Sequence, residues 1–274
     1  MNKSLYVYPS LGKSGLGNLL YVWARAEAFS RLHGLRMIAP TWARFTRIGP
    51  WLRGEKYKRF YGADFVPGNY VHGLRKLVLL GTKRKFAERN DSMEDYLSRD
   101  GIIVFSGLKG RGDFNSFLDC QPAIKNKLLE IAHPRVLRQV DGASSYIGVH
   151  VRRGDFAVGN LVTSDAWFVR AINRALRHEA AKGHSEIRVF SDGYPDELSF
   201  IQKAFPDERV RIMGKDPPLA DILSLSRSCV MVASPRSTFS AWAVFLGQMP
   251  SIWSPQYEVP KMYLEPNANP IIVE

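Results

Sequence analysis

The second half of the chain alternates short apolar runs with longer amphipathic runs, and this pattern constrains the fold more than any other feature. Strands that alternate with helices are typical of a parallel sheet covered by helices on both faces. The apolar runs predict strands at 146–151, 187–190, 210–213, 229–233 and 251–253. The amphipathic runs predict helices at 165–181, 195–204, 218–227 and 238–247, the first of them capped by Ser164.

The start of the chain shows the same alternation once. A strand, a glycine-rich turn, a helix that stops at Gly34 and a second strand are predicted at 5–8, 12–17, 18–33 and 35–39. From 42 to 119 the pattern loosens and predicts only a few short elements. Because single cores stop growing near about 250–300 residues, we expect two α/β domains in this 274-residue chain. They are an N-terminal acceptor-side domain, 1–140, and a C-terminal nucleotide-binding domain, 141–274.

The positive charge is concentrated in the first part of the chain. Residues 1–111 hold 20 Lys and Arg against 8 Asp and Glu, whereas residues 112–274 hold 18 of each. A basic surface suits an anionic membrane face, an anionic substrate or a nucleic acid, or it is an ordinary solvated face. No nucleic-acid-binding module is present in the sequence, so we expect no nucleic-acid partner. We favour peripheral contact with an anionic membrane or acidic glycolipid.

Several features bear on the cellular compartment. No apolar run approaches the ~18 residues of a membrane-spanning helix. The apolar stretch at the start of the sequence is too short for the hydrophobic region of a secretory signal. Cys120 and Cys229 stand alone, without a CxxC pair or a Cys/His cluster, so neither a disulfide nor a zinc site is expected. These features predict a cytoplasmic protein, and the basic first part of the chain adds the expectation of peripheral contact with the inner membrane face.

Polar segments follow three of the predicted strands, where an open parallel sheet binds its ligands. They are 150–155 (HVRRGD), 191–193 (SDG) and 234–240 (SPRSTFS). In the first segment, strand alternation puts His150 and Arg152 on one face, and Arg153 follows at the strand exit. A guanidinium there can donate two hydrogen bonds to a diphosphate and stabilise the charge that develops on a phosphate leaving group. Ordinary ion pairs at a strand end are the alternative.

The third segment leads into a helix beginning near Thr238. The unsatisfied N–H groups of its first turn suit a phosphate, and Ser237 and Thr238 add hydroxyl donors. Simple capping by these hydroxyls is compatible with that role. Near the N-terminus, Gly17 and Asn18 end a glycine-rich turn that completes no Walker A motif. We expect the backbone of that turn to approach a ligand closely, with the Asn18 amide presented to it.

Taken together, 15–18 (GLGN), the HVRRGD segment, 190–192 (FSD) and 237–242 (STFSAW) resemble glycosyltransferase family eleven, the α-1,2-fucosyltransferases. The order and spacing match over most of the chain. The resemblance implies a GT-B-like α/β fold, with two Rossmann-like domains facing a cleft. It also implies a GDP-fucose donor in the C-terminal half, inversion at the anomeric carbon, and no cofactor or obligatory metal.

The resemblance assigns roles to the first two strand-end segments. Arg153 matches the family arginine on the β-phosphate, with Arg152 and His150 supporting it. Asp192 matches an acidic position on the nucleoside side. The general base is not identified, and Asp155, the nearest carboxylate by sequence, is our candidate.

The resemblance assigns the remaining donor contacts as well. Ser237, Thr238 and Phe239 match the segment that holds the diphosphate and packs near the guanosine. Asn18, next to Gly17, matches the residue near the transferred sugar.

Two departures mark a divergent family member. The usual Gly-Asn-Gln has Leu19 in its third position, and the usual Ser-Phe-Ser-Trp-Trp is replaced by the STFSAW segment. We expect an enzyme that transfers fucose from GDP-fucose to a glycan or a lipid-linked saccharide, with α-1,2 linkage. A transferase using another GDP-sugar, and a non-catalytic module that binds a GDP-sugar or phosphoglycan, are the alternatives.

Overall fold

The computed structural model describes residues 4–42, 61–88, 99–107, 114–140, 146–153, 162–184, 186–214, 216–264 and 268–274. The chain divides into two compact units. The first comprises Met1–Arg111 and Cys120–Arg135, and the second comprises Gly112–Asp119 and Val136–Glu274. The assignment of acceptor and nucleotide functions to 1–140 and 141–274 stays a prediction. No helix within the described ranges is long and apolar enough to cross a membrane.

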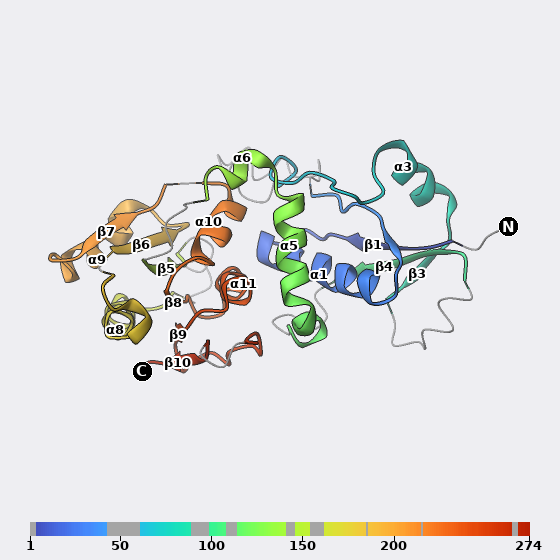
Figure 1. The fold of residues 1–274 in the computed structure, drawn as a ribbon. Coiled ribbons are helices and arrows are strands. Elements are labelled where there is room, and N and C mark those ends of the chain that lie inside the picture. The colour runs from blue at the N-terminus through green and yellow to red at the C-terminus, as the bar shows by residue number, and fades with distance from the viewer. Residues whose placement is uncertain are drawn as a thin grey trace. The chain divides into compact units, whose positions relative to one another are not determined.

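The first unit contains a parallel sheet in the order β2-β1-β4-β3 (Figure 1). Its strands are β1 (Leu5–Ser10), β2 (Arg36–Met37), β3 (Lys85–Ala87) and β4 (Gly101–Ser106). The two strands predicted near the start of the chain are present, although β2 is shorter than expected. The sequence analysis missed β4, which pairs with β1 along its whole length.

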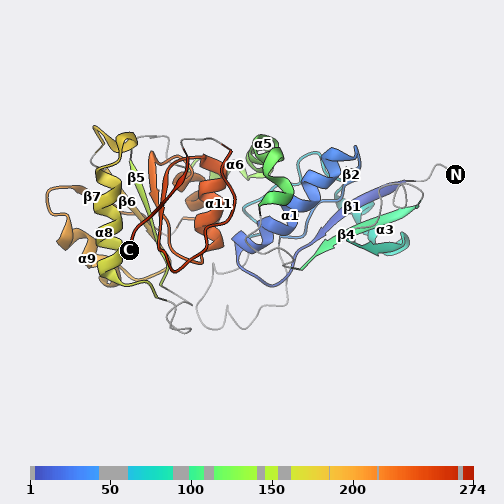
Figure 2. The ribbon, with the colours of Figure 1, turned by 90° about the horizontal axis from the view of Figure 1, so that it is seen from below.

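Helices cover both faces of this sheet, as Figures 1 and 2 both show. On one face, α1 (Leu16–Leu32) packs Phe29 against Phe105 of β4, with 5.3 Å between the ring centroids. On the other face, α3 (Gly73–Thr82) contributes Leu79 to a core with Tyr6 and Ile102. The sequence analysis predicted α1 to within two residues but did not identify α3. Gly34 ends the α1 turn in the left-handed region at φ 61°, as its position predicted.

The described residues between β4 and β5 in the sequence, 114–140, are mostly helical. They form a 3₁₀ segment (Asn115–Cys120), α5 (Gln121–Ile131) and the short α6 (Pro134–Leu137). The sequence analysis predicted none of these elements.

The second unit contains a parallel sheet in the order β10-β9-β8-β5-β6-β7, which confirms the predicted α/β class. The strands are β5 (Ile147–Val151), β6 (Glu186–Ser191), β7 (Arg209–Ile212), β8 (Val230–Val232), β9 (Ser251–Trp253) and β10 (Pro270–Ile272). All five strands predicted in this half are present. The prediction that the sheet ends with 251–253 is wrong, because β10 adds a further strand beside β9.

The connecting helices follow the prediction with small changes. They are α8 (Asp165–Leu176), α9 (Ser199–Ala204) after a 3₁₀ turn (Pro195–Leu198), α10 (Pro218–Leu225) and α11 (Thr238–Gly247). Ser164 caps α8 by accepting a hydrogen bond from the Trp167 N–H, as predicted. The helix ends at Leu176 rather than at residue 181, and a separate 3₁₀ turn (Glu179–Ala181) follows it.

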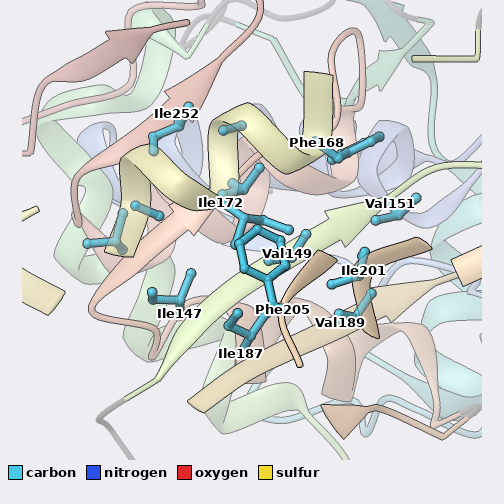
Figure 3. Close-up of a cluster of buried hydrophobic side chains, with 14 of the residues drawn as sticks. Ile147, Val149, Val151, Phe168, Ile172, Ile187, Val189, Ile201, Phe205 and Ile252 are labelled. Atoms are coloured by element: carbon cyan, nitrogen blue, oxygen red, sulfur yellow. The ribbon is translucent and has the colours of Figure 1, made fainter. Parts of the chain in front are cut away.

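The central strand β5 divides its side chains between two helical layers. Its odd-numbered residues, Ile147, Val149 and Val151, enter a core built with α8, α9 and the neighbouring strands (Figure 3). Its even-numbered residues turn to the opposite layer, where a Cβ on Gly148 would stand 2.9 Å from the Cβ of Ser228, just after α10. His150 shares this second direction. The alternation therefore decides which layer each residue near the end of β5 will reach.

Candidate functional site

Three strand ends meet at the carboxyl edge of the second sheet, where β5 lies between β8 and β6. The Arg152 N–H, directly after β5, donates to Ser234 Oγ, just beyond β8, at 3.1 Å. The next amide, Arg153 N–H, donates to Asp192 Oδ1, directly after β6, at 2.8 Å. The structure thus brings together the three segments that the sequence analysis placed at strand ends.

Asp192 holds the two arginines in different ways. Its Oδ1 accepts from the Arg153 backbone, and its Oδ2 forms an ion pair with Arg152 Nη1 at 3.2 Å. The Arg152 side chain remains 27% exposed and that of Asp192 19% exposed. Nearby, Ser191 Oγ donates to the Val151 carbonyl at 2.6 Å and so fixes the turn that carries Asp192. A positioned, solvent-accessible guanidinium therefore lies at the sheet edge.

Arg153, in contrast, points into the protein. Only 6% of the residue is exposed. Its guanidinium donates to the Thr163 carbonyl at 3.0 Å and pairs with Asp165 at the start of α8. It also lies over the Phe200 ring, 5.4 Å from the centroid.

The predicted contact of the Arg153 guanidinium with a diphosphate stays a prediction, and in the structure this guanidinium turns toward the start of α8. The reason is that the alternation of β5 continues for one residue pair past the strand. Arg153 therefore follows Val149 and Val151 into the layer of α8 and α9.

His150 joins the end of β5 to the start of α11. Its Nδ1 lies 2.7 Å from Ser240 Oγ, which also accepts from the Ser234 N–H at 3.1 Å. The imidazole stacks on Phe239 with 4.8 Å between the ring centroids. Burial, with a smaller contribution from the Arg152 charge, lowers the pKa of His150 to about 3. The ring is therefore neutral at physiological pH and joins two elements of the site.

The start of α11 presents a helix N-terminus beside this edge. Ser237 is the N-cap, and its Oγ accepts from the Ser240 N–H at 3.3 Å, so the predicted capping role is present. Thr238 and Phe239 are half-buried in the first turn. The preceding Arg236 is exposed and has a left-handed backbone at φ 58°. The sequence analysis quoted Arg236 but gave it no role; a non-glycine residue in this conformation is strained, as residues near binding sites often are.

A further carboxylate, Asp221, was missed by the sequence analysis. It stands in the first turn of α10, and its Oδ1 is buried without a hydrogen-bond partner among the described residues. Burial, with a smaller contribution from Asp216, raises its pKa to about 8. Because α10 connects β7 to β8 in a parallel sheet, it begins at the carboxyl edge. A single acid within the apolar run 218–225 was the sequence signal that marked it.

Two predicted residues belong to the first unit and one lies outside the described ranges. Gly17 is buried in the first turn of α1, and Asn18 follows it half-buried. Asn18 Oδ1 is buried and has no hydrogen-bond partner within the described residues. Asp155, the candidate general base, lies among the residues that the structure does not describe. Within the described ranges, no group of three or more His, Cys, Asp or Glu residues is arranged to hold a metal ion.

Comparison with solved structures shows the same fold in known fucosyltransferases. Fucosyltransferase NodZ from Bradyrhizobium aligns with a TM-score of 0.59 at 17% identity, covering 91% of this chain and 94% of NodZ. POFUT1 in complex with GDP aligns with a TM-score of 0.55 at 14% identity, covering 91% and 97%. NodZ alpha-1,6-fucosyltransferase soaked with GDP-fucose aligns at 0.57 and 18% identity, covering 90% and 94%. The GT-B-like fold class is therefore confirmed.

The family assignment comes from the sequence itself. No curated protein sequence matches the chain. The sequence model of glycosyl transferase family 11, in contrast, matches residues 114–261, more than half of the chain. This span includes all three strand-end segments, α10 and α11. The chain belongs to glycosyl transferase family 11.

Proposed function

We propose that this protein transfers L-fucose from GDP-fucose to a glycan or a lipid-linked saccharide, with inversion and in α-1,2 linkage. Membership of glycosyl transferase family 11 supports sugar transfer. Solved neighbours in complex with GDP or soaked with GDP-fucose support the donor. The observation that carries the proposal is the partly exposed Arg152 guanidinium, held by Asp192 at the meeting point of three strand ends.

Arg152, rather than Arg153, is the residue that we assign to the diphosphate. Negative charge develops on the leaving nucleoside diphosphate, so a guanidinium fixed in advance stabilises the transition state more than the ground state. Arg152 is accessible for this contact. The first turn of α11 supplies further N–H donors. Arg236, just before α11, supplies further positive charge. Arg153, His150 and Asp192 act as positioning residues, because their contacts fix the backbone around Arg152.

Asp221 is our candidate for recognition of the nucleobase. The buried Oδ1 of Asp221 has no hydrogen-bond partner among the described residues, which suits a base that offers adjacent N–H donors. The raised pKa keeps this carboxyl protonated in the free protein, and two N–H donors of a bound base favour its ionised form. Guanine offers two on its N1 and N2 edge, whereas uracil offers one N–H between two carbonyls. This difference supports GDP over UDP as the nucleotide of the donor.

The acceptor end of the site rests on the sequence alone. We keep Asn18, with Gly17, as the contact near the transferred sugar and Asp155 as the candidate general base. We keep Ser237, Thr238 and Phe239 as contacts of the diphosphate and guanosine. We also propose that neither a cofactor nor an obligatory metal takes part, since arginine can replace the cation on the diphosphate.

Nucleotide binding gives the first test. A true ligand present at 100 times its dissociation constant stabilises the folded state by about 2.7 kcal/mol, so thermal shifts with GDP, UDP and CMP at equal concentration rank the three nucleotides. GDP against UDP compares the bases. We expect GDP to give the largest shift. Arg152→Ala should lower it strongly, whereas Arg174→Ala, which removes an exposed arginine of α8, serves as the matched control. A larger shift with UDP than with GDP contradicts the proposed donor.

Turnover separates the enzyme from a binding module. Incubation with GDP-fucose and a panel of glycans, followed by NMR of the product, should show a fucosylated product and its linkage and anomeric configuration. Parallel reactions with other GDP-sugars test the choice of sugar. Binding of GDP without transfer or hydrolysis of any GDP-sugar would favour the non-catalytic alternative.

A further inference from the structure

Helix α3 of the first unit turns an apolar face to solvent. Leu74, Leu77 and Val78 are 76%, 66% and 52% exposed. Successive residues of a helix are rotated by roughly 100°, so these three side chains form one stripe, which continues past the exposed Gly81. No charged or polar residue stands within the stripe. We call these three side chains and Gly81 the α3 stripe.

The opposite side of α3 attaches it to the sheet. Leu79 is 8% exposed and packs with Tyr6 and Ile102, with Leu80 partly buried beside them. Lys76 donates to Thr41 Oγ1 at 2.8 Å and further fixes this side. The α3 stripe is therefore held outward by a core on the other side of the same helix. A surface helix usually carries polar residues on its outer face, so this pattern indicates a contact that the described residues do not supply.

The charged residues of the segment that carries the α3 stripe are all basic. Between residues 65 and 87 there are five Lys and Arg residues and no Asp or Glu. Of these cations, Arg75, Arg84 and Lys85 are exposed. Lys83 is paired with Asp100 at 2.6 Å, so part of its charge is neutralised. The exposed leucines are thus flanked by cations whose charge is not balanced within this segment.

From this combination we infer that the α3 stripe is a docking surface for an anionic lipid bilayer. Its leucines enter the boundary between headgroups and acyl chains, and Arg75, Arg84 and Lys85 contact anionic headgroups. An amphipathic helix with apolar residues on one face and basic residues beside them binds membranes in this way.

A second copy of the chain fits the α3 stripe less well. Two such surfaces face to face would bring the same cations together without any acidic partner in the segment. Three side chains on one ten-residue helix also supply only part of the about 1,200–2,000 Å² that a stable interface buries. A bilayer needs no such area from a single helix and complements the charge.

Vesicle flotation tests the inference on the full chain. The wild type should float with vesicles of phosphatidylcholine and phosphatidylglycerol, and much less with phosphatidylcholine alone. The bound fraction with anionic vesicles should fall as salt rises, because screening weakens contacts between exposed charges. The paired substitution Leu74→Ser and Leu77→Ser should lower the partition coefficient by about tenfold or more.

A second pair of variants and a control guard against a folding defect. Arg84→Gln with Lys85→Gln leaves the apolar residues intact and should also lower binding, by about tenfold in all. Leu264→Ser removes an exposed leucine from the second unit, 42% exposed, and should leave flotation unchanged. Circular dichroism and the GDP-induced thermal shift should be the same in all variants. Vesicle binding needs no donor, so this test and that of the proposed function fail independently.

Three results overturn the inference. One is a wild type that does not float with anionic vesicles, and another is a leucine pair variant that floats as well as the wild type. The third is a wild-type dimer in light scattering that becomes a monomer on substitution of Leu74 and Leu77. That last result assigns the α3 stripe to a second copy.

Discussion

The two sides of β5 carry polar residues for different purposes. On the side of α8 and α9, Arg153 is enclosed by Phe200, Thr163 and Asp165 and has little contact with solvent. At the carboxyl edge one residue earlier, Arg152 keeps more than a quarter of its side chain exposed and forms an ion pair with the Asp192 carboxylate. Neighbouring arginines of one motif can therefore differ in role because the pleat of a strand sends them in different directions.

Replacing Arg152 by alanine gives the largest predicted effect, which is on catalysis. Arg152→Ala should lower kcat/KM by about 10²–10³-fold, because it removes a charge that acts in the transition state. Its melting temperature should change little, since the side chain is partly solvated and its ion pair contributes little. Steady-state kinetics and calorimetry on the same preparation measure both quantities.

Arg153→Ala should show the opposite balance. Loss of its packing and hydrogen bonds should cost about 2–3 kcal/mol of unfolding free energy, equivalent to a fall in melting temperature of roughly 4–12 °C. Turnover at a temperature where the variant is folded should fall less than in Arg152→Ala. If Arg153→Ala is as stable as wild type but inactive, our assignment of the two arginines is reversed.

The second sheet could be predicted from the sequence because its signals are local. Its first five strands in chain order lie in short, mostly apolar runs between recognisable helices, and Ser164 and Ser237 are ordinary capping residues. The direction of the Arg153 side chain could also be predicted, since Arg153 lies an even number of positions after Val149 and Val151 and side chains alternate along a strand. The family motif adds nothing to this point, because it names the residue type and not the side of the strand.

The first unit was harder to predict because its elements depend on distant partners. The run at β4 is apolar and short, and only its pairing with β1, almost a hundred residues earlier, makes it a strand. Helix α3 has apolar residues on two opposite sides, so no single amphipathic pattern marks it. The Asp221 environment arises from tertiary burial, which local sequence does not report.

Asp221 extends the comparison of the two sides of β5. It lies in the layer of α10 and α11, opposite to Arg153, and it makes the folded protein less stable. Its pKa is about 8 in the folded protein and 3.8 ordinarily. Between these values the folded protein keeps a proton that the unfolded chain releases. The unfolding free energy therefore falls as pH rises through this window and levels off above about pH 8.

Asp221→Asn should remove this pH dependence and separate stability from binding. We expect a higher melting temperature than wild type, with a difference that grows from about pH 5 to about pH 8. GDP affinity should fall by about 10–100-fold, because the amide cannot accept two N–H donors as a carboxylate does. Calorimetry and titration with GDP at both pH values measure the two effects. An unchanged GDP affinity would contradict the nucleobase assignment.

His150 provides the matching acid-side prediction. Its pKa is about 3 in the folded protein and 6.5 ordinarily, so the unfolded chain binds a proton in this window and the folded protein does not. The corresponding stabilisation is fully present above 6.5 and is lost as pH falls toward 3. His150→Asn should be less stable at neutral pH but should show a flatter decline in acid. The matched control is His72→Gln, an exposed site in the first unit, which should keep the wild-type slope.

Substitution of Gly193 gives the smallest predicted effect on stability. It tests whether the Arg153 side chain is fixed on the α8 and α9 side of β5. A Cβ at this position would stand 2.9 Å from Arg153 Cγ and 2.9 Å from Glu197 Oε2. Because Arg153 is held by Thr163 and Asp165, it cannot move aside freely. Gly193→Ala should therefore cost about 1–2 kcal/mol of unfolding free energy.

A double-mutant cycle can assign that cost to Arg153. Arg153→Ala removes the Cγ atom, so adding Gly193→Ala to that variant should cost less than adding it to wild type. The difference, measured by denaturant unfolding, is the coupling between the two positions. Additive losses would place the strain on Glu197 or on the Arg153 Cβ, which alanine keeps and which would stand 3.0 Å from the added methyl group. A coupled loss would mean that Gly193 is needed because an arginine, buried on the side of α8 and α9, passes beneath the turn that carries Asp192.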